Sequence, residues 1–272
     1  FGRVLEAAAD DKAYQALLLT LPAAKYLSQF MPVIDPDALE EVTHFVRRTL
    51  ADAFADALLA VYLANHDPGS DRRDRESMGR RCLKNVCLRY LAERGDREAL
   101  DLCVRQFRAG GNMTDIAAAL SGLADCAGAE RQATLDAFHD RWKTDPLVVD
   151  KWFAIQVASR LPDTLERAKA LTAHPDFTWK NPNRVLALIG TFADNQRRFH
   201  HAGGEGYRFL ADAILAIDPL NPQIAARLAS AFTMWRRFDA HRQALMKEEL
   251  ERILGAPRLS RDAQEIVSKT LA

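Results

Sequence analysis

Four pairs of residues, each an aspartate or asparagine followed by a proline, fix where helices begin in this chain. They are Asp35-Pro36, Asp145-Pro146, Asn181-Pro182 and Asn221-Pro222. The first side chain accepts hydrogen bonds from N–H groups of the first turn, and a proline at the first helical position loses none. The last two pairs lie 40 positions apart, about the period of a helix-pair repeat of the HEAT or armadillo kind. The sequence therefore predicts repeated helix pairs.

Apolar residues recur at helical spacing almost throughout, and no run alternates with the period of a strand. We expect helices near residues 3–20, 36–65, 77–93, 97–108, 114–126, 130–143, 147–159, 163–173, 182–194, 205–217, 222–234, 239–255 and 260–271. The connections are short, so neighbouring helices should pack antiparallel. The predicted fold class is all-α, a curved superhelical stack of antiparallel helix pairs (a HEAT/armadillo-like α-solenoid). We expect residues 1–272 to form a single helical domain.

The charge balance argues against some classes of partner. Lys plus Arg and Asp plus Glu both number 37, so the formal net charge is zero, whereas non-specific nucleic-acid binding needs excess positive charge. No segment approaches the roughly 18 apolar residues of a membrane span, and no signal peptide is apparent. We therefore expect neither a nucleic-acid nor a membrane partner. Because Phe1 is not an initiator methionine, we expect the chain to begin either at an engineered boundary or at a cut end.

The four cysteines, Cys82, Cys87, Cys103 and Cys126, do not follow a metal-binding pattern. Cys82 and Cys87 lie on a predicted helix at a spacing that does not share one face well. Neither a histidine pair nor a second close cysteine pair completes a zinc site. We expect buried free thiols in a reducing compartment, so the predicted location is the cytoplasm.

The sequence shows no catalytic constellation. None of the seven histidines lies in a His-Glu-x-x-His motif, and there is no Gly-x-Ser-x-Gly elbow and no phosphate-binding glycine loop. A metal held by His200, His201 and Glu205 is a weak alternative, because adjacent histidines on a regular backbone point in different directions. We expect no catalytic residue, no metal ligands and no cofactor in this chain.

Two arginines are the candidate binding residues. Arg184 follows the Asn181 cap within the first helical turn, where free N–H groups beside a guanidinium would suit a carboxylate ligand. A solvated arginine, or one paired with a nearby acid, is the alternative. Arg227 lies among small and apolar residues, and it either lines a cavity or extends from a packed face to solvent. The residues alone leave these alternatives open.

Several phrases of the sequence are distinctive. They are Arg81-Cys-Leu-Lys-Asn-Val-Cys-Leu-Arg89, Asn112-Met-Thr-Asp115, Asp150-Lys-Trp-Phe153, Phe177-Thr178, Asn181-Pro-Asn-Arg184 and the run from Asn221 through Arg227 to Asp239. Together they resemble the C-terminal domain of the bacterial aminopeptidase N family, with similar spacing from about Pro32 to Ala272. This family comprises zinc metallo-aminopeptidases of the gluzincin type, also called alanyl aminopeptidases.

The resemblance implies an activity whose chemistry lies outside this chain. Such enzymes remove N-terminal amino acids from peptides with a zinc held by two histidines and a glutamate, and this chain has none of those motifs. The resemblance implies that residues 1–272 enclose the active-site chamber of a larger cytoplasmic enzyme. Its partners would be the catalytic domain of the same polypeptide and peptide substrates. By resemblance, Arg184 and Arg227 would line the substrate channel.

A free-standing HEAT-like scaffold that binds a protein or peptide partner is the alternative function. The two hypotheses differ in one cheap observation, which is whether the parent reading frame continues upstream into a His-Glu-x-x-His motif.

Overall fold

All four of the predicted proline-containing caps form. The structure is a computed structural model and describes residues 1–68 and 70–272. Asp35 Oδ1 accepts a hydrogen bond from the N–H of Ala38 at 2.9 Å. The side chains of Asp145, Asn181 and Asn221 likewise accept bonds from the first turns of their own helices. These helix starts are therefore fixed by local chemistry.

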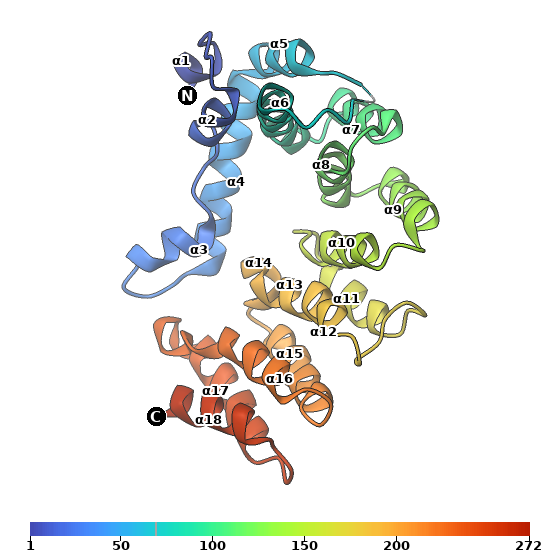
Figure 1. Ribbon diagram of the computed structural model, residues 1–272. Helices are drawn as coiled ribbons and strands as arrows, with labels where there is room; N and C mark the ends of the chain where they lie inside the picture. The colour runs from blue at the N-terminus through green and yellow to red at the C-terminus, as the bar shows by residue number, and fades with distance from the viewer. Residues whose placement is uncertain (69) are drawn as a thin grey trace. The chain divides into compact units, whose positions relative to one another are not determined.

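Helices make up nearly all of the regular structure (Figure 1). In chain order they are α1 Gly2–Leu5, α2 Lys12–Leu18, α3 Ala24–Leu27, η1 Ser28–Phe30, α4 Pro36–Ala53, α5 Ala55–Asn65, α6 Arg75–Glu93, α7 Arg97–Ala109, α8 Met113–Ala124, α9 Ala129–Trp142, α10 Pro146–Val157, α11 Thr164–Thr172, α12 Pro182–Val185, η2 Leu186–Gly190, α13 Thr191–Asp194, α14 Gln196–Phe199, α15 Glu205–Ile217, α16 Pro222–Ala229, η3 Ser230–Phe232, η4 Trp235–Arg237, α17 Ala240–Leu254 and α18 Arg261–Leu271. The described residues form no strand, only an isolated parallel bridge between Ile34 and Phe238. The all-α prediction is confirmed. No helix in the described part of the chain is both long and apolar enough to cross a bilayer.

The predicted helix boundaries need three corrections. Residues 3–20 form two helices, because Asp11 accepts a hydrogen bond from the N–H of Tyr14 and starts α2 anew. Residues 36–65 divide at Phe54, whose backbone leaves the helical region at φ −118° and ψ 21°. The helix predicted at 222–234 ends at Ala229 and continues in 3₁₀ turns. Two short helices, α3 and α14, were not predicted at all.

The chain divides into two compact units, and each has its own apolar core. Unit 1 comprises residues 1–23 and 41–140, with α6 packed against α2, α5, α7 and α8. Unit 2 comprises residues 24–40 and 141–272, with α10 against α11, α15 against α16 and α17, and α16 against α18. That residues 1–272 act as one domain stays a prediction.

Unit 2 joins two segments that are far apart in the sequence. Arg237 donates to the carbonyls of Gln29 and Met31, and its own carbonyl accepts from the N–H of Ile34 at 2.6 Å. Arg242 then pairs with Asp37 at 2.5 Å. The start of α4 is thereby fastened to the start of α17.

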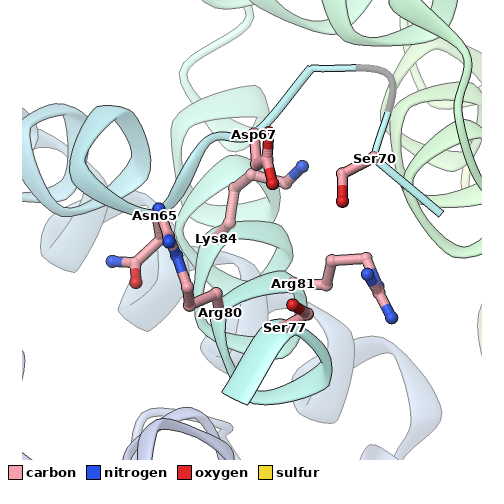
Figure 2. A pocket seen from close by; sticks show the side chains of 7 residues that line it. All are labelled: Asn65, Asp67, Ser70, Ser77, Arg80, Arg81 and Lys84. Atoms are coloured by element: carbon pink, nitrogen blue, oxygen red, sulfur yellow. The ribbon is translucent and has the colours of Figure 1, made fainter. Parts of the chain in front are cut away.

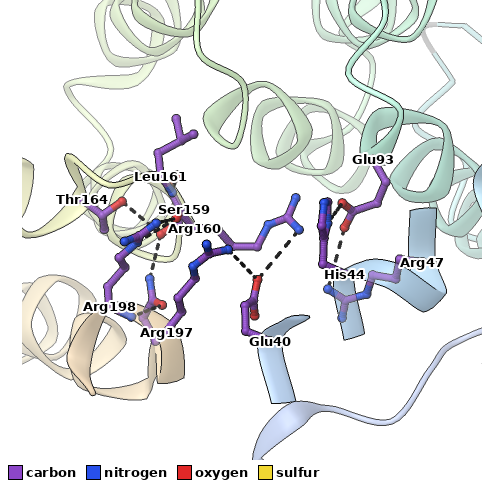
Figure 3. A network of polar contacts seen from close by, with 11 residues as sticks. Glu40, His44, Arg47, Glu93, Ser159, Arg160, Leu161, Thr164, Arg197 and Arg198 are labelled. Atoms are coloured by element: carbon purple, nitrogen blue, oxygen red, sulfur yellow. Dashed lines mark hydrogen bonds and ion pairs between the residues drawn. The ribbon is translucent and has the colours of Figure 1, made fainter. Parts of the chain in front are cut away.

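Polar contacts also fix the short helix α14 within unit 2 (Figure 3). Asn195 caps α14 and donates to the carbonyls of Val157 and Ser159 at 3.0 and 2.8 Å. Arg198 donates to the carbonyl of Arg160. Val157 is the last residue of α10, and Ser159 and Arg160 follow it closely, so these polar contacts hold α14 against the end of that helix.

The same unit has an acidic residue between two arginines (Figure 3). Glu40 Oε1 lies 3.5 Å from Arg197 and 4.0 Å from Arg160.

In unit 1, Glu93 is 3.2 Å from His44 and 3.8 Å from Arg47. These contacts join α6 to α4.

Candidate functional site

Arg184 lies in the first turn of α12, where Asn181 accepts from its backbone N–H at 3.3 Å. Its side chain is 7% exposed, and its Nε donates to Oδ1 of Asp150 on α10 at 2.5 Å. One terminal nitrogen donates to the carbonyl of Asp176 and the other to that of Pro146 at 3.4 Å. The guanidinium therefore joins the start of α12 to α10 and to the turn that precedes α12.

Aromatic rings surround this ion pair. The guanidinium carbon of Arg184 lies 5.0 Å from the ring centre of Phe153, within cation–π range. The ring centres of Phe153 and Phe177 lie 6.1 Å apart, and those of Phe177 and Trp179 lie 5.1 Å apart, and both pairs pack edge to face. Three of the distinctive phrases, 150–153, 177–178 and 181–184, therefore meet at one place.

The sequence predicted that a carboxylate ligand would suit the site beside Arg184. In the structure, the carboxylate at this site is the side chain of Asp150. This matches the alternative of an arginine paired with a nearby acid. Because Arg184 directs three of its N–H groups to protein acceptors, its visible role is to hold helices together. Its contact with a substrate stays a prediction.

Arg227 has a different environment. It lies in the last turn of α16 and is exposed. No hydrogen bond or ion pair with another described residue engages its guanidinium, and none joins it to Arg184. The structure therefore offers Arg227, and not Arg184, as an available cation.

The weak alternative of a metal site at the histidine turn is not supported. His200 is 4% exposed, lies 3.0 Å from the hydroxyl of Tyr207 and stacks on Phe238 at 4.2 Å. His201 is exposed and lies 3.8 Å from Glu205. These three candidate ligands do not converge, because His200 belongs to the core and His201 to the surface.

The cysteine prediction holds for two of the four residues. Cys87 and Cys103 are buried free thiols, and burial raises the pKa of each to about 12. Cys82 is exposed and Cys126 is half-buried, so the expectation that all four are buried is wrong. Cys82 lies outside the apolar face of α6 that carries Cys87.

Unit 1 contains a buried ion pair that was not predicted from the sequence. Lys84 on α6 donates to Oδ2 of Asp115 on α8 at 2.7 Å, and their side chains are 1% and 6% exposed. Asn85 and Asn112 also donate to this carboxylate, each at 2.9 Å. The sequence feature that could have indicated this pair is the position of Lys84, which lies on the same face of α6 as the buried residues Leu83, Cys87 and Leu88. The phrases 81–89 and 112–115 meet at this pair.

A family model covers residues 1–272, the whole of this chain, and its description is "Domain of unknown function (DUF3458_C) ARM repeats". The chain belongs to this family. Membership in the DUF3458_C family confirms the prediction of an armadillo-type helical fold.

Three relatives connect this DUF3458_C domain with aminopeptidases. It is 41% identical over 271 residues to aminopeptidase N of Caulobacter vibrioides, covering 99% of this chain and 31% of that protein. It is 40% identical over 264 residues to aminopeptidase N of Escherichia coli, covering 96% of this chain and 30% of that protein. A crystal structure of Legionella pneumophila aminopeptidase A in complex with aspartic acid superposes with a TM-score of 0.89 at 33% identity. The match covers 98% of this chain and 32% of that one.

These relatives confirm the resemblance that the distinctive phrases indicated. The chain spans about a third of the length of each relative.

Proposed function

We propose that residues 1–272 form the C-terminal helical domain of a zinc aminopeptidase. In this proposal the domain encloses the active-site chamber and shapes substrate access, and does not catalyse the reaction itself. The observation that carries the proposal is the similarity, along nearly the whole chain, to proteins named aminopeptidase N. The substrates would be peptides with a free N-terminus. A cytoplasmic location is part of the proposal, supported by four cysteines that form no disulfide with one another.

The residues of this chain do not fit the zinc site of such an enzyme. They contain no His-Glu-x-x-His motif, so the metal and the general base would be held by residues outside this chain.

We include both candidate arginines in the proposed substrate channel. Arg227 is the stronger substrate contact, because an exposed guanidinium without a protein acceptor is available to a peptide carboxylate or carbonyl. Arg184 has a side chain that is only 7% exposed and already pairs with Asp150. Its effect on substrate would be through the position of α12.

The first experiment measures zinc content and hydrolysis of an alanyl chromogenic amide by this chain and by its full-length parent. We expect zinc and turnover in the parent and neither in the chain alone. If this chain alone hydrolysed the amide and a chelator abolished the hydrolysis, the proposal that the domain encloses the chamber without catalysing the reaction would be overturned. A parent reading frame without an upstream His-Glu-x-x-His motif would favour the free-standing scaffold instead.

The second experiment replaces Arg227 with Ala in the full-length parent. We expect a higher KM for di- to tetrapeptides and an unchanged melting temperature, because the side chain makes no bond within the described protein. Arg73→Ala is the matched control, since Arg73 is an exposed cation in the other unit. Unchanged kinetics across this peptide series would exclude a substrate contact by Arg227.

A further inference from the structure

A small pocket lies at the N-terminal end of α6 in unit 1 (Figure 2). Its lining combines three cationic side chains with one carboxylate, two hydroxyls and one amide: Arg80, Arg81, Lys84, Asp67, Ser70, Ser77 and Asn65. The free volume is about 10 Å³, which accommodates one particle of about the size of a water molecule.

The first turn of α8 holds two walls of this pocket in place. Asn112 caps α8 and donates from Nδ2 to the carbonyl of Ser70 at 2.8 Å. Three residues later, Asp115 accepts from Lys84 at 2.7 Å. The pocket is therefore built by tertiary contacts.

Lys84 places a buried ammonium at this pocket, and its side chain is 1% exposed. An ammonium has three N–H donors, and Asp115 is its one acceptor among the residues that the structure describes. Figure 2 shows the side chain extending from α6 towards Asp67, although no ion pair within 4.0 Å joins them. A buried charge with open donors favours a further acceptor.

The two arginines add positive charge without a matching acid. Arg81 makes no hydrogen bond or ion pair with any described residue. Arg80 donates to the carbonyl of Ala64 at 3.3 Å, while its buried Nε has no acceptor within the described ranges. Asp115 is already occupied by Lys84 and two asparagines, and Asp67 is the one carboxylate among the described residues that line the pocket.

The cations are also close enough to repel one another. Burial lowers the pKa of Lys84 and Arg81 lowers it further, while Asp115 and, more weakly, Asp67 act in the opposite direction. An anion between the ammonium and the guanidinium would relieve this repulsion.

We propose that this pocket binds one small monovalent anion, of which chloride is the representative, between Lys84 and Arg81. The size of the pocket favours a monatomic ion over phosphate or a peptide carboxylate. The bound anion would stabilise unit 1 by linking α6 to the segment at Ser70. This proposal is independent of the aminopeptidase function.

The test compares thermal unfolding of the 272-residue chain in sodium chloride and in sodium gluconate at equal ionic strength. We expect the melting temperature to rise with chloride concentration and then to saturate, as for any ligand of the native state. A crystal soaked in sodium bromide should show an anomalous peak in the pocket. Equal melting temperatures in both salts, or no bromide peak there, would overturn the proposal.

Three variants locate the effect. Arg81→Gln should abolish the chloride-specific rise, whereas Arg73→Gln, at an exposed cation outside the pocket, should retain it. Asp67→Asn should shift saturation to lower chloride, because it removes the charge that repels the anion. A chloride effect that persists in Arg81→Gln would place the ion elsewhere. A weaker effect in Asp67→Asn would show that the carboxylate, and not the anion, completes the site.

Discussion

Arg184 donates from Nε to Oδ1 of Asp150 at 2.5 Å, across 34 positions of sequence. The two side chains are 7% and 15% exposed, so the pair is largely withdrawn from water. Removing one partner of a buried ion pair costs about 3–5 kcal/mol, because the other charge is left uncompensated. We expect Arg184→Ala to lower the free energy of unfolding by about 3 kcal/mol in urea titrations.

The matched control for this change is Arg227→Ala, which removes an exposed arginine of the same unit. We expect it to stay within about 0.5 kcal/mol of the wild type. Wild-type stability of Arg184→Ala would show that the pair does not hold α12 to α10, and would return Arg184 to the list of available cations.

Lys84 and Asp115 should behave as a coupled pair. Lys84→Met leaves the Asp115 carboxylate, which is only 6% exposed, without its cation. We expect this variant to lose about 3 kcal/mol of unfolding free energy. Lys84→Met combined with Asp115→Asn removes both charges, so the double variant should lose less than the sum of the single variants. Chemical denaturation of all four proteins measures this coupling, and additive losses would contradict it.

His200 predicts a loss of stability in acid. Burial, reinforced by Arg242 and Lys25, lowers the pKa of His200 to about 3, whereas an unfolded histidine has a pKa of about 6.5. The unfolded chain therefore takes up a proton as the pH falls through about 6.5, and the native chain does not until about 3. Stability falls within this window by up to about 1.4 kcal/mol per pH unit.

The measurement is the free energy of unfolding at about pH 7 and about pH 5. His200→Gln should show a smaller difference than the wild type, because glutamine does not titrate. His201→Gln, at the exposed neighbour, should keep the wild-type difference. The same pH dependence in all three proteins would assign the acid sensitivity to carboxylates.

Two glycines should respond in opposite directions to alanine. A Cβ at Gly206 would lie 2.4 Å from the carbonyl oxygen of Phe199 and 3.0 Å from its Cα, and this backbone has no room to yield. Gly206→Ala should cost about 1–3 kcal/mol. At Gly255 the nearest atom would be 3.4 Å away and φ is −76°, so Gly255→Ala should gain about 0.4–1 kcal/mol. Melting temperatures of the two variants test the contrast.

The sequence determined the local features of this fold. Asp35, Asp145, Asn181 and Asn221 cap the helices they were predicted to cap, because a cap needs only the following two or three residues. Helical spacing of apolar residues likewise predicted most elements from 75 to 271. It failed at Phe54 and between α1 and α2, where packing or a new cap interrupts a pattern that is apolar enough to continue.

The partners of buried charges were decided by tertiary structure alone. Arg184 had three interpretations in the sequence, and Asp150 selected one of them from 34 positions away. Lys84 and Asp115 are separated by 31 positions, and nothing in either phrase names the other. Periodicity specifies which face of a helix is buried. Only the packing of one helix on another decides which charge meets which, because an ion pair requires two side chains within a few ångströms and sequence spacing does not set that distance.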